Sequence, residues 1–215
     1  MPSLEEIKNA LAELNEELAL RLVKIALEEK VPAFDVLRAC QDGMTEVGRR
    51  FECRDYFIPE LVMSGEIFKQ LTAILEPGLK PGGMQSAGKI VFGTVKGDIH
   101  DIGKDIVVNM LKSANFEVLD LGVDVPPEKF ISALEESGAS VLGMSGLLTL
   151  AFDSMKATVQ ALAAADLRGK VRVMIGGGPV DANVCRVVGA DAWGADAQQA
   201  VRLAKAWLAP VQGAQ

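Results

Sequence analysis

Few residues in this sequence suit a metal site that the protein builds by itself. The chain of 215 residues holds one histidine, His100, and three cysteines, Cys40, Cys53 and Cys185. The cysteines are widely spaced and no two of them form a CxxC pair, so neither a disulfide framework nor a zinc site is indicated. One imidazole and three distant thiols do not complete an ordinary transition-metal site, and we expect the thiols to have no special role.

Long apolar runs and an excess of positive charge are also absent. No apolar stretch reaches the roughly 20 residues that a membrane-spanning helix needs. The first residues, MPSLEEIKNALAEL, are acidic and lack the basic-then-apolar order of a signal peptide. The net charge of −7 argues against nucleic acid as a partner, because phosphate binding needs a basic face. These absences predict a cytoplasmic protein with neither a membrane nor a nucleic acid as partner.

Residues 3 to about 76 predict a small bundle of about four helices. The stretch from Ser3 to Glu6 has the Ser-x-x-Glu form of a capping box, which satisfies free N–H groups at a helix start. Asn15 suits the cap of a second short helix, Pro32 the first turn of a third that runs to about Arg50, and Pro59 the start of a fourth. An apolar stripe at three- and four-residue spacing follows the first start: Leu11, Leu14, Leu18, Leu22, Ile25 and Ala26.

The pattern changes after the Pro- and Gly-rich stretch LEPGLKPGGMQSAGK, which marks a linker near residues 76–88. We expect two domains, residues 1–86 and residues 87–215. In the second, short β-branched runs alternate with longer helical ones, which implies right-handed βαβ units and a doubly wound, five-stranded parallel sheet of the α/β class. The expected strands are Ile90–Val95, Glu117–Leu121, Val141–Ser145, Val171–Ile175 and a short one near Asp191–Trp193. The expected helices span about residues 104–114, 127–137, 151–165, 182–188 and 196–208.

Ligands of such sheets bind beyond the carboxyl ends of the strands, which directs attention to three loops. These are GDIHDIG at residues 97–103, SGLLTLAF at residues 145–152 and GGGPVD at residues 176–181. His100 lies in the first loop, where it has three interpretations: a turn residue, a general base or a metal ligand. The glycine run in the third loop is either a tight turn or a slot through which a bulky group passes.

A cofactor that carries most of its own ligands would make a single histidine sufficient. In a tetrapyrrole-type ring four nitrogens occupy the equatorial positions, so the protein need supply only one axial imidazole. Asp98 could then accept a hydrogen bond from the ring nitrogen that is not on the metal, which fixes the tautomer. Ser145, expected at the same edge of the sheet, could extend this hydrogen-bond chain.

The order of three motifs resembles the cobalamin-binding signature shared by methionine synthase and certain mutases. These motifs are Asp98-x-His100-x-x-Gly103, Ser145-x-Leu147 and Gly176-Gly177. The helical half is also similar to a known module: MTEVGRRFECRDYFIPELVMSGEIF resembles the cap bundle of the small corrinoid proteins of methyltransferase systems. The resemblance covers about residues 3–208. It implies a four-helix cap bundle followed by a Rossmann-like (flavodoxin-like) cobalamin-binding domain.

The resemblance also implies roles for individual residues. His100 would replace the cofactor's own dimethylbenzimidazole as the lower axial ligand of cobalt, so that cobalamin binds base-off, and Asp98 and Ser145 would complete a ligand triad. Asp101 and Ile102 lie inside the motif and count among the cofactor-binding residues, although Asp101 also suits the cap of the next helix. The channel for the nucleotide tail would be lined by Gly103, Ser145, Leu147, Thr149, Gly176, Gly177 and Gly178.

In the family the helical bundle covers the upper face of the corrin. Phe57 and Met63 are the candidates for this cover here, and ordinary bundle core is the alternative. The implied function is that of a carrier rather than of an enzyme acting alone. Cobalt accepts a methyl group from a substrate-specific methyltransferase, and a second methyltransferase passes it to tetrahydrofolate or coenzyme M. A reductive activating protein is a further expected partner. The methyl donor (methanol, a methylamine, betaine or an aryl methyl ether) is selected by the partner, so this sequence need not encode it.

Three other functions remain open at this point. The first is a cobalamin-dependent sensor, which uses the same two modules; the chain shows no basic helix-turn-helix or other output segment, so it would act through a separate partner. The second is the cobalamin subunit of a mutase, which the cap bundle fits poorly. The third is a flavodoxin-like domain that binds another cofactor or none.

Overall fold

A computed structural model describes residues 2–79 and 86–208. The chain divides into two compact units, Met1–Gln85 and Ser86–Gln215. The predicted linker near residues 76–88 falls partly outside the described residues; its first part forms a short 3-10 turn, Glu76–Gly78. None of the helices in the described ranges is long and apolar enough to cross a membrane.

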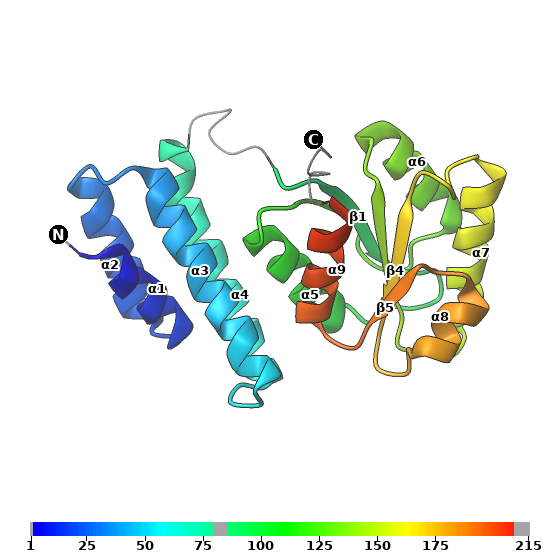
Figure 1. Ribbon diagram of the computed structural model, residues 1–215, viewed down its shortest axis with the longest axis horizontal. Coiled ribbons are helices and arrows are strands. Elements are labelled where there is room, and N and C mark those ends of the chain that lie inside the picture. Colours follow the sequence, from blue (N-terminus) through cyan, green and yellow to red (C-terminus); the bar gives the residue numbers. More distant parts are fainter. Residues whose placement is uncertain (1, 80–85, 209–215) are drawn as a thin grey trace, which may run out of the picture. The chain divides into compact units, whose positions relative to one another are not determined.

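The first unit is a bundle of four α-helices, as the sequence predicts (Figure 1). Ser3 and Glu6 form the expected capping box, and the Asn15 side chain accepts a hydrogen bond from the N–H of Leu18. Leu14 does not continue the apolar stripe in a helix, because it adopts a left-handed conformation (φ 59°) in the turn between the first two helices. The helices are α1 Leu4–Ala12, α2 Glu16–Glu28, α3 Ala33–Glu52 and α4 Ile58–Leu75.

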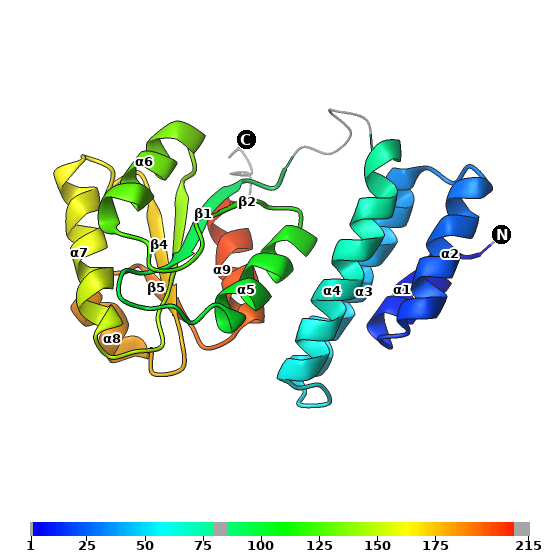
Figure 2. The same ribbon diagram turned by 180° about the vertical axis from the view of Figure 1, so that it is seen from behind.

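The second unit is a five-stranded parallel sheet with helices on both faces. The strand order is β2-β1-β3-β4-β5. Helices α5 and α9 cover one face of the sheet, and α6, α7 and α8 cover the other (Figures 1 and 2). The strands are β1 Lys89–Thr94, β2 Glu117–Asp120, β3 Val141–Ser145, β4 Arg172–Gly176 and β5 Ala192–Gly194. The helices are α5 Ile102–Ser113, α6 Pro127–Ser137, α7 Ala151–Ala164, α8 Ala182–Val188 and α9 Ala197–Leu208.

The predicted α/β class and the predicted strands and helices are confirmed, with bounds that agree within two residues. The strands were recognisable because their central residues are buried on both faces and therefore read as continuous apolar runs. Their core includes Val91, Leu142, Met144, Val173 and Ile175, all at most 2% exposed.

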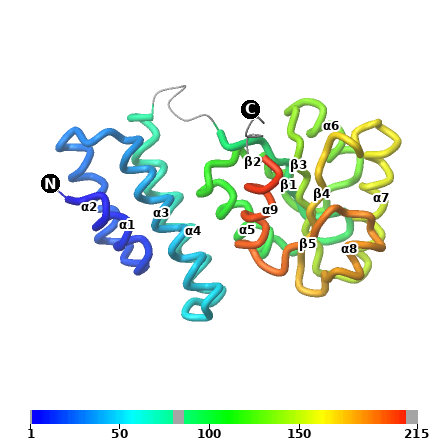
Figure 3. Tube along the Cα trace, in the orientation of Figure 1, coloured from blue at the N-terminus to red at the C-terminus, as the bar shows by residue number. Residues whose placement is uncertain are grey.

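The strand order defines where a ligand can enter. Chain connections run from β1 outward to β2 and then back across β1 to β3, as the trace in Figure 3 shows. The loops after β1 and β3 therefore leave the sheet in opposite directions, and ligands of doubly wound sheets bind at the carboxyl ends of two such neighbouring strands. Two of the three glycine-containing loops singled out in the sequence, those that follow Thr94 and Ser145, begin at this switch point.

Candidate functional site

The carboxylate of Asp98 is the centre of the site. Asp98 lies in the β1–α5 loop and is completely buried. One oxygen, Oδ1, accepts hydrogen bonds from the backbone N–H of His100 at 3.0 Å and lies 2.7 Å from the His100 ring atom Nδ1. The other oxygen, Oδ2, accepts hydrogen bonds from the backbone N–H groups of Leu147 at 2.6 Å and Leu148 at 3.0 Å. Asp98 therefore joins the loops that follow β1 and β3.

Asp98 is ionised over the whole physiological pH range. Burial alone raises the pKa of its carboxyl, because a buried charge loses its hydration. Hydrogen bonds from the N–H groups of Leu148 and His100, from the His100 ring and from the N–H of Leu147 outweigh burial and lower the pKa from 3.8 to about 2. The charge of the buried group is thus balanced by four hydrogen-bond donors.

The ionised carboxylate determines how His100 presents its ring. An ionised carboxylate only accepts hydrogen bonds, so Nδ1 must carry the proton in the 2.7 Å contact. In the neutral ring the proton is then absent from Nε2, which keeps its lone pair for a metal ion or an acid. The His100 side chain is 49% exposed while that of Asp98 is 0% exposed. The buried carboxylate therefore fixes one end of an imidazole whose other face meets solvent.

Backbone contacts fix the β1–α5 loop around these two residues. The hydroxyl of Thr94, the last residue of β1 and itself buried, donates to the carbonyl of His100 at 3.1 Å. The N–H of Asp98 donates to the carbonyl of Val95 at 3.1 Å. From the β2–α6 loop, Asp124 contacts both Gly97 and Asp98. The loop is thus held from β1 and from its neighbour β2.

Close backbone packing brings the loop after β4 to the same place. The N–H of Gly146 donates to the carbonyl of Gly176 at 3.1 Å. Gly177 has φ 142°, and a Cβ atom there would overlap the carbonyl oxygen of Gly146. The space that the missing Gly177 side chain leaves is therefore filled by backbone and is not an open slot. Gly178 differs, because a Cβ there would contact only the Leu147 side chain, at 3.1 Å.

The rim of the site is unusually apolar for exposed surface. Large aliphatic side chains of the loops after β1 and β3 are exposed, and Leu150 is 76% and Ile99 73% exposed. Those of the first loop are Ile99 and Ile102, and those of the second are Leu147, Leu148 and Leu150. Isolated exposed apolar residues are ordinary, but a group contributed by two adjacent loops at a sheet edge indicates a binding surface.

The other residues predicted for the site lie in these loops, with some differences in contacts. Ser145 ends β3 beside Thr94, but its hydroxyl makes no hydrogen bond among the described residues. The expected hydrogen-bond chain from Asp98 to Ser145 is thus not present. Asp101 occupies the N-cap position of α5, but its side chain makes no capping bond. Gly103 and Thr149 lie exposed at the starts of α5 and α7.

The sequence does not reveal four of the groups that hold this arrangement together. The N–H groups of Leu147 and Leu148 bind Asp98 through the backbone, so their side chains carry no signal for it. Asp124 does carry a sequence signal, because a Gly-x-Asp sequence in a loop is typical of turns with positive φ. Thr94 lies inside the strand that the sequence predicts, and the pattern gives no sign of its contact with the His100 carbonyl.

The two residues of the bundle that the sequence suggests as a cover of the corrin, Phe57 and Met63, lie on the surface of the bundle. Phe57 is the N-cap residue of α4 and is 63% exposed, and Met63 in the same helix is 51% exposed. The interpretation of these two residues as ordinary bundle core is therefore wrong. Ile58 and Val62 are exposed beside them in the sequence.

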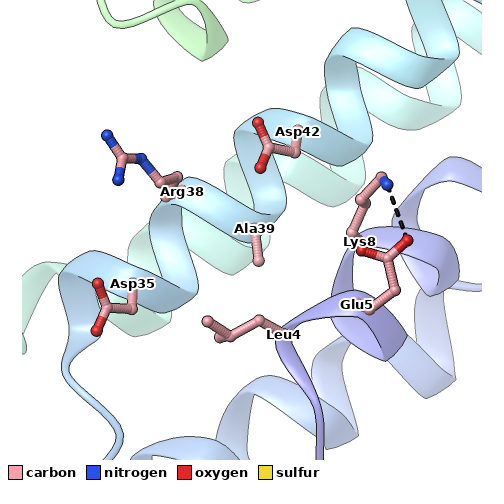
Figure 4. A pocket seen from close by; sticks show the side chains of 7 residues that line it. All are labelled: Leu4, Glu5, Lys8, Asp35, Arg38, Ala39 and Asp42. Atoms are coloured by element: carbon pink, nitrogen blue, oxygen red, sulfur yellow. Dashed lines mark hydrogen bonds and ion pairs between the residues drawn. The ribbon is translucent and has the colours of Figure 1, made fainter.

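A separate hollow of the bundle carries no comparable chemistry. It lies between α1 and α3 and is lined mainly by charged side chains, with Lys8 and Glu5 paired at 2.8 Å (Figure 4). In the described part of the chain no group of three or more histidine, cysteine, aspartate or glutamate residues could hold a metal ion. A metal bound through His100 would therefore bring other ligands with it.

Fold and site together define a doubly wound cofactor-binding domain that offers one oriented imidazole. Comparisons with known proteins agree with this class. Residues 88–202 match the model of a B12 binding domain, and residues 3–76 match that of a second B12 binding domain. The chain is 38% identical over 208 residues to a corrinoid protein of Desulfitobacterium hafniense, covering 95% of this chain and 96% of the relative. It is 38% identical over 207 residues to the dimethylamine corrinoid protein of Methanosarcina barkeri, covering 96% of this chain and 97% of the relative.

The same likeness holds in three dimensions. The crystal structure of the methanol:cobalamin methyltransferase complex from Methanosarcina barkeri matches with a TM-score of 0.83 at 26% identity, covering 96% of this chain and 79% of that chain. This chain therefore belongs to the B12 binding domain family and, within it, to the corrinoid proteins.

The residues at the edge of β1 and β3 fit a corrinoid. The half-exposed His100 ring offers one nitrogen ligand, which is what a ring with four equatorial nitrogens leaves to the protein. The exposed aliphatic side chains of Ile102, Leu147 and Leu150 suit the apolar faces and edges of such a macrocycle. The site residues thus agree in chemistry with the family assignment.

Proposed function

We propose that this protein is a methyl carrier that binds cobalamin base-off, with His100 as the lower axial ligand. It accepts a methyl group from a substrate-specific methyltransferase and delivers it to a second methyltransferase that uses tetrahydrofolate or coenzyme M. One observation carries the proposal: the Nδ1 atom of the half-exposed His100 ring lies 2.7 Å from a completely buried carboxylate, which leaves Nε2 free to bind a metal ion.

Different residues of the site would bind different parts of the cofactor. When bound, the corrinoid supplies the cobalt ion that accepts and releases the methyl group. Asp98 keeps the proton of His100 on Nδ1 and increases the electron density at Nε2, because its negative charge faces the opposite side of the ring. We assign Ser145 and Thr149, together with Gly103, Gly176 and Gly178, to the path of the displaced nucleotide tail, where small side chains and hydroxyl groups leave room and offer hydrogen bonds. Gly177 contributes only through its backbone contact with Gly146.

The bundle supplies the cover of the opposite face of the corrin. Phe57 and Met63, together with Ile58 and Val62, form an exposed apolar patch at the start of α4. Such a patch excludes water from an apolar ligand, and we assign Phe57 and Met63 to this cover. Because both methyltransferases need access to the methyl group, the cover moves aside at each transfer.

The partner methyltransferase, and not this protein, selects the methyl donor. One relative is named for dimethylamine, and one solved relative is a complex with a methanol:cobalamin methyltransferase, so similar chains serve different methyl donors. The donor is selected in the pocket of the methyltransferase that presents it. A reductive activating protein is the third partner, since a carrier that depends on a reduced metal must be restored after accidental oxidation.

The presence of a single histidine allows a direct test of the ligand. The untagged protein is loaded with hydroxocobalamin and reduced to the paramagnetic cobalt(II) form, once with natural histidine and once with histidine labelled with nitrogen-15. Ligation by His100 predicts a superhyperfine triplet that becomes a doublet on labelling, because nitrogen-14 has spin one and nitrogen-15 has spin one-half. His100→Gly should abolish the label-dependent change and weaken cobalamin binding. A triplet that persists after labelling would show that the cofactor's own base is the ligand.

Methyl transfer tests the carrier role itself. The loaded protein is reduced to the cobalt(I) form and treated with radiolabelled iodomethane, which methylates the metal with loss of iodide. It is then mixed with tetrahydrofolate or coenzyme M and the corresponding second methyltransferase. Transfer of the label to either acceptor supports the carrier function. Stable cobalamin binding without any transfer to either acceptor would favour a cobalamin-dependent sensor that acts through another protein.

A further inference from the structure

The segment between β2 and α6 runs beside the loop that contains His100. Two backbone hydrogen bonds join it to the last residue of β1: the N–H of Thr94 donates to the carbonyl of Gly122 at 2.9 Å, and the N–H of Val125 donates to the carbonyl of Thr94 at 3.0 Å. Val95 and Val125 form an isolated parallel bridge. Residues 122–125 therefore follow β1 beyond the end of the sheet and reach the start of the β1–α5 loop.

Asp124 makes two contacts with this loop, in opposite directions. Its side-chain atom Oδ1 accepts a hydrogen bond from the N–H of Gly97 at 2.7 Å. Its backbone N–H donates to the carbonyl of Asp98 at 3.0 Å. A donor and an acceptor of one residue thus bind two consecutive residues of the loop, so that neither residue can rotate without breaking a hydrogen bond.

The backbone at Asp124 adopts a conformation that few residues tolerate. Its φ is 52°, in the left-handed region, which glycine, asparagine and aspartate enter at low cost. Glycine would allow the same backbone path but would leave the Gly97 N–H without its acceptor. A short carboxylate at this position is therefore suited both to the turn and to the bond with a residue 27 positions earlier in the chain.

The residues that Asp124 fixes are those that orient the proposed ligand. Gly97 and Asp98 directly precede Ile99 and His100, and the position of the Asp98 carboxylate depends on the backbone at Asp98. If the backbone of Gly97 and Asp98 turned, the Asp98 carboxylate would lose its hydrogen bonds with the N–H groups of the β3–α7 loop and with the ring of His100 at the same time. A contact outside the cofactor site thus controls the geometry inside it.

We propose that Asp124 is a positioning residue: it binds the N–H of Gly97 and the carbonyl of Asp98 and so fixes the backbone on both sides of the Asp98 side chain, which lets Asp98 orient the His100 ring for cobalt ligation. The inference rests on the proposed function, since it concerns the same histidine. Asp124 itself does not touch the ring. Its loss should leave the fold intact and broaden the set of conformations of the loop.

Three substitutions distinguish the effect of the Asp124 carboxylate from the effect of the left-handed backbone at this position. Asp124→Gly keeps the left-handed backbone and removes the acceptor, and Asp124→Asn keeps both a side-chain oxygen and the backbone preference. Asp166→Gly is the matched control, because Asp166 is also an exposed aspartate with positive φ (56°) but lies in the turn after α7. Differences between Asp124→Gly and Asp166→Gly therefore report the contact with the loop and not the change to glycine.

The first measurement needs no cofactor. Amide hydrogen exchange is followed in the cobalamin-free protein, with the Val91 amide in the central strand as the reference for global opening. We expect the Gly97 amide to exchange about 10- to 100-fold faster in Asp124→Gly, the range that corresponds to loss of a hydrogen bond to a charged acceptor. Asp124→Asn should restore most of the protection, and Asp166→Gly should leave it unchanged. Equal exchange of Gly97 in the wild type and Asp124→Gly would overturn the proposal.

The second measurement uses the cobalt(II) spectrum of the loaded protein. We expect Asp124→Gly to reduce the fraction of protein with the histidine-dependent superhyperfine pattern, and Asp124→Asn to restore it. If the wild type has this pattern and Asp124→Gly has it undiminished, the inference about Asp124 fails while the proposed function stands. If the wild type lacks the pattern and resembles His100→Gly, the proposed ligation itself fails.

Discussion

Gly177 packs directly on the backbone of Gly146, and this contact joins the loop after β4 to the loop after β3. The second of these loops also supplies the two N–H groups that bind Asp98. The glycine run of the sequence thus serves a close approach between two backbones. It acts on the site through the position of the residues that follow Gly146.

The Gly177 contact leads to a prediction about stability. Gly177→Ala should destabilise the protein by about 2–4 kcal/mol, because the new Cβ would overlap the Gly146 carbonyl and the φ of 142° is unfavourable for alanine. Gly178→Ala is the comparison, since its Cβ would contact only the movable end of the Leu147 side chain, and we expect a loss below about 1 kcal/mol. Urea denaturation of the cobalamin-free proteins measures both. Similar losses for the two variants would contradict the assigned contact.

The lowered pKa of Asp98 predicts a pH-dependent contribution to stability. A carboxyl whose pKa is lower in the folded than in the unfolded protein stabilises the fold above the unfolded value and loses this effect as the pH falls through the folded value. For Asp98 the window lies between about pH 4 and pH 2, and the shift from 3.8 to about 2 corresponds to roughly 2 kcal/mol.

Asp98→Asn tests this contribution. At pH 7 we expect a loss of about 2–4 kcal/mol, because the asparagine NH₂ group cannot accept the bonds that one carboxylate oxygen accepts now. The difference in unfolding free energy between wild type and variant should shrink as the pH is lowered from 5 to 3. The exposed Asp166 provides the control as Asp166→Asn. A difference between wild type and Asp98→Asn that does not change with pH would show that the carboxylate charge is not what stabilises this site.

The buried ammonium group of Lys104 leads to a third prediction. The Lys104 side chain is 4% exposed, and its Nζ lies 2.5 Å from both Asp105 and Asp120. Burial by itself lowers the pKa of Lys104, but the two carboxylates outweigh it and raise the pKa, so the group stays charged. Asp120 also accepts the N–H of Gly122 at 2.9 Å, so the ion pair links the first turn of α5 to the segment that contains Asp124.

Removal of this charge should cost stability. Lys104→Met keeps most of the side-chain volume, and we expect a loss of about 1–3 kcal/mol because Asp120 would remain half-buried without its cation. Lys112→Met, at an exposed position of the same helix, should change stability by less than about 0.5 kcal/mol. In a double-mutant cycle the combination of Lys104→Met with Asp120→Asn should cost less than the sum of the single changes. Strict additivity would show that the two groups do not stabilise one another.

Local sequence signals were sufficient for the elements of this fold and for the loop that carries His100. Continuous apolar runs mark β1, β3 and β4 because these strands are buried on both faces, and the same alternation places the loops at one edge of the sheet. The pairing of Asp98 with His100 was also accessible, since the two residues are separated by a single position. A contact between residues so close in the sequence is decided by the local backbone alone.

The remaining contacts depend on which loops become neighbours. Asp98 binds N–H groups that follow it by 49 and 50 residues, and such donors exist at every position of every sequence except proline. For the same reason the sequence points to the Ser145 hydroxyl as an extension of the hydrogen-bond chain and gives no sign of the Leu147 and Leu148 amides that bind Asp98. The strand order, which a pattern of alternating elements does not encode, decides these neighbours.

The exposed patch of α4 leads to the last prediction. If Phe57 covers the upper face of the bound corrinoid, Phe57→Ala should expose the cobalt to solvent, and cyanide should replace the upper ligand of the hydroxocobalamin-loaded protein severalfold faster. Leu4→Ala is the control, because Leu4 is an exposed aliphatic residue of the same bundle at the start of α1. Both variants should keep their stability within about 0.5 kcal/mol, since neither side chain belongs to the bundle core. Stopped-flow absorbance follows the reaction. Equal cyanide rates for Phe57→Ala, Leu4→Ala and the wild type would remove Phe57 from the cover, and the same comparison with Met63→Ala would then decide whether this end of α4 has that role.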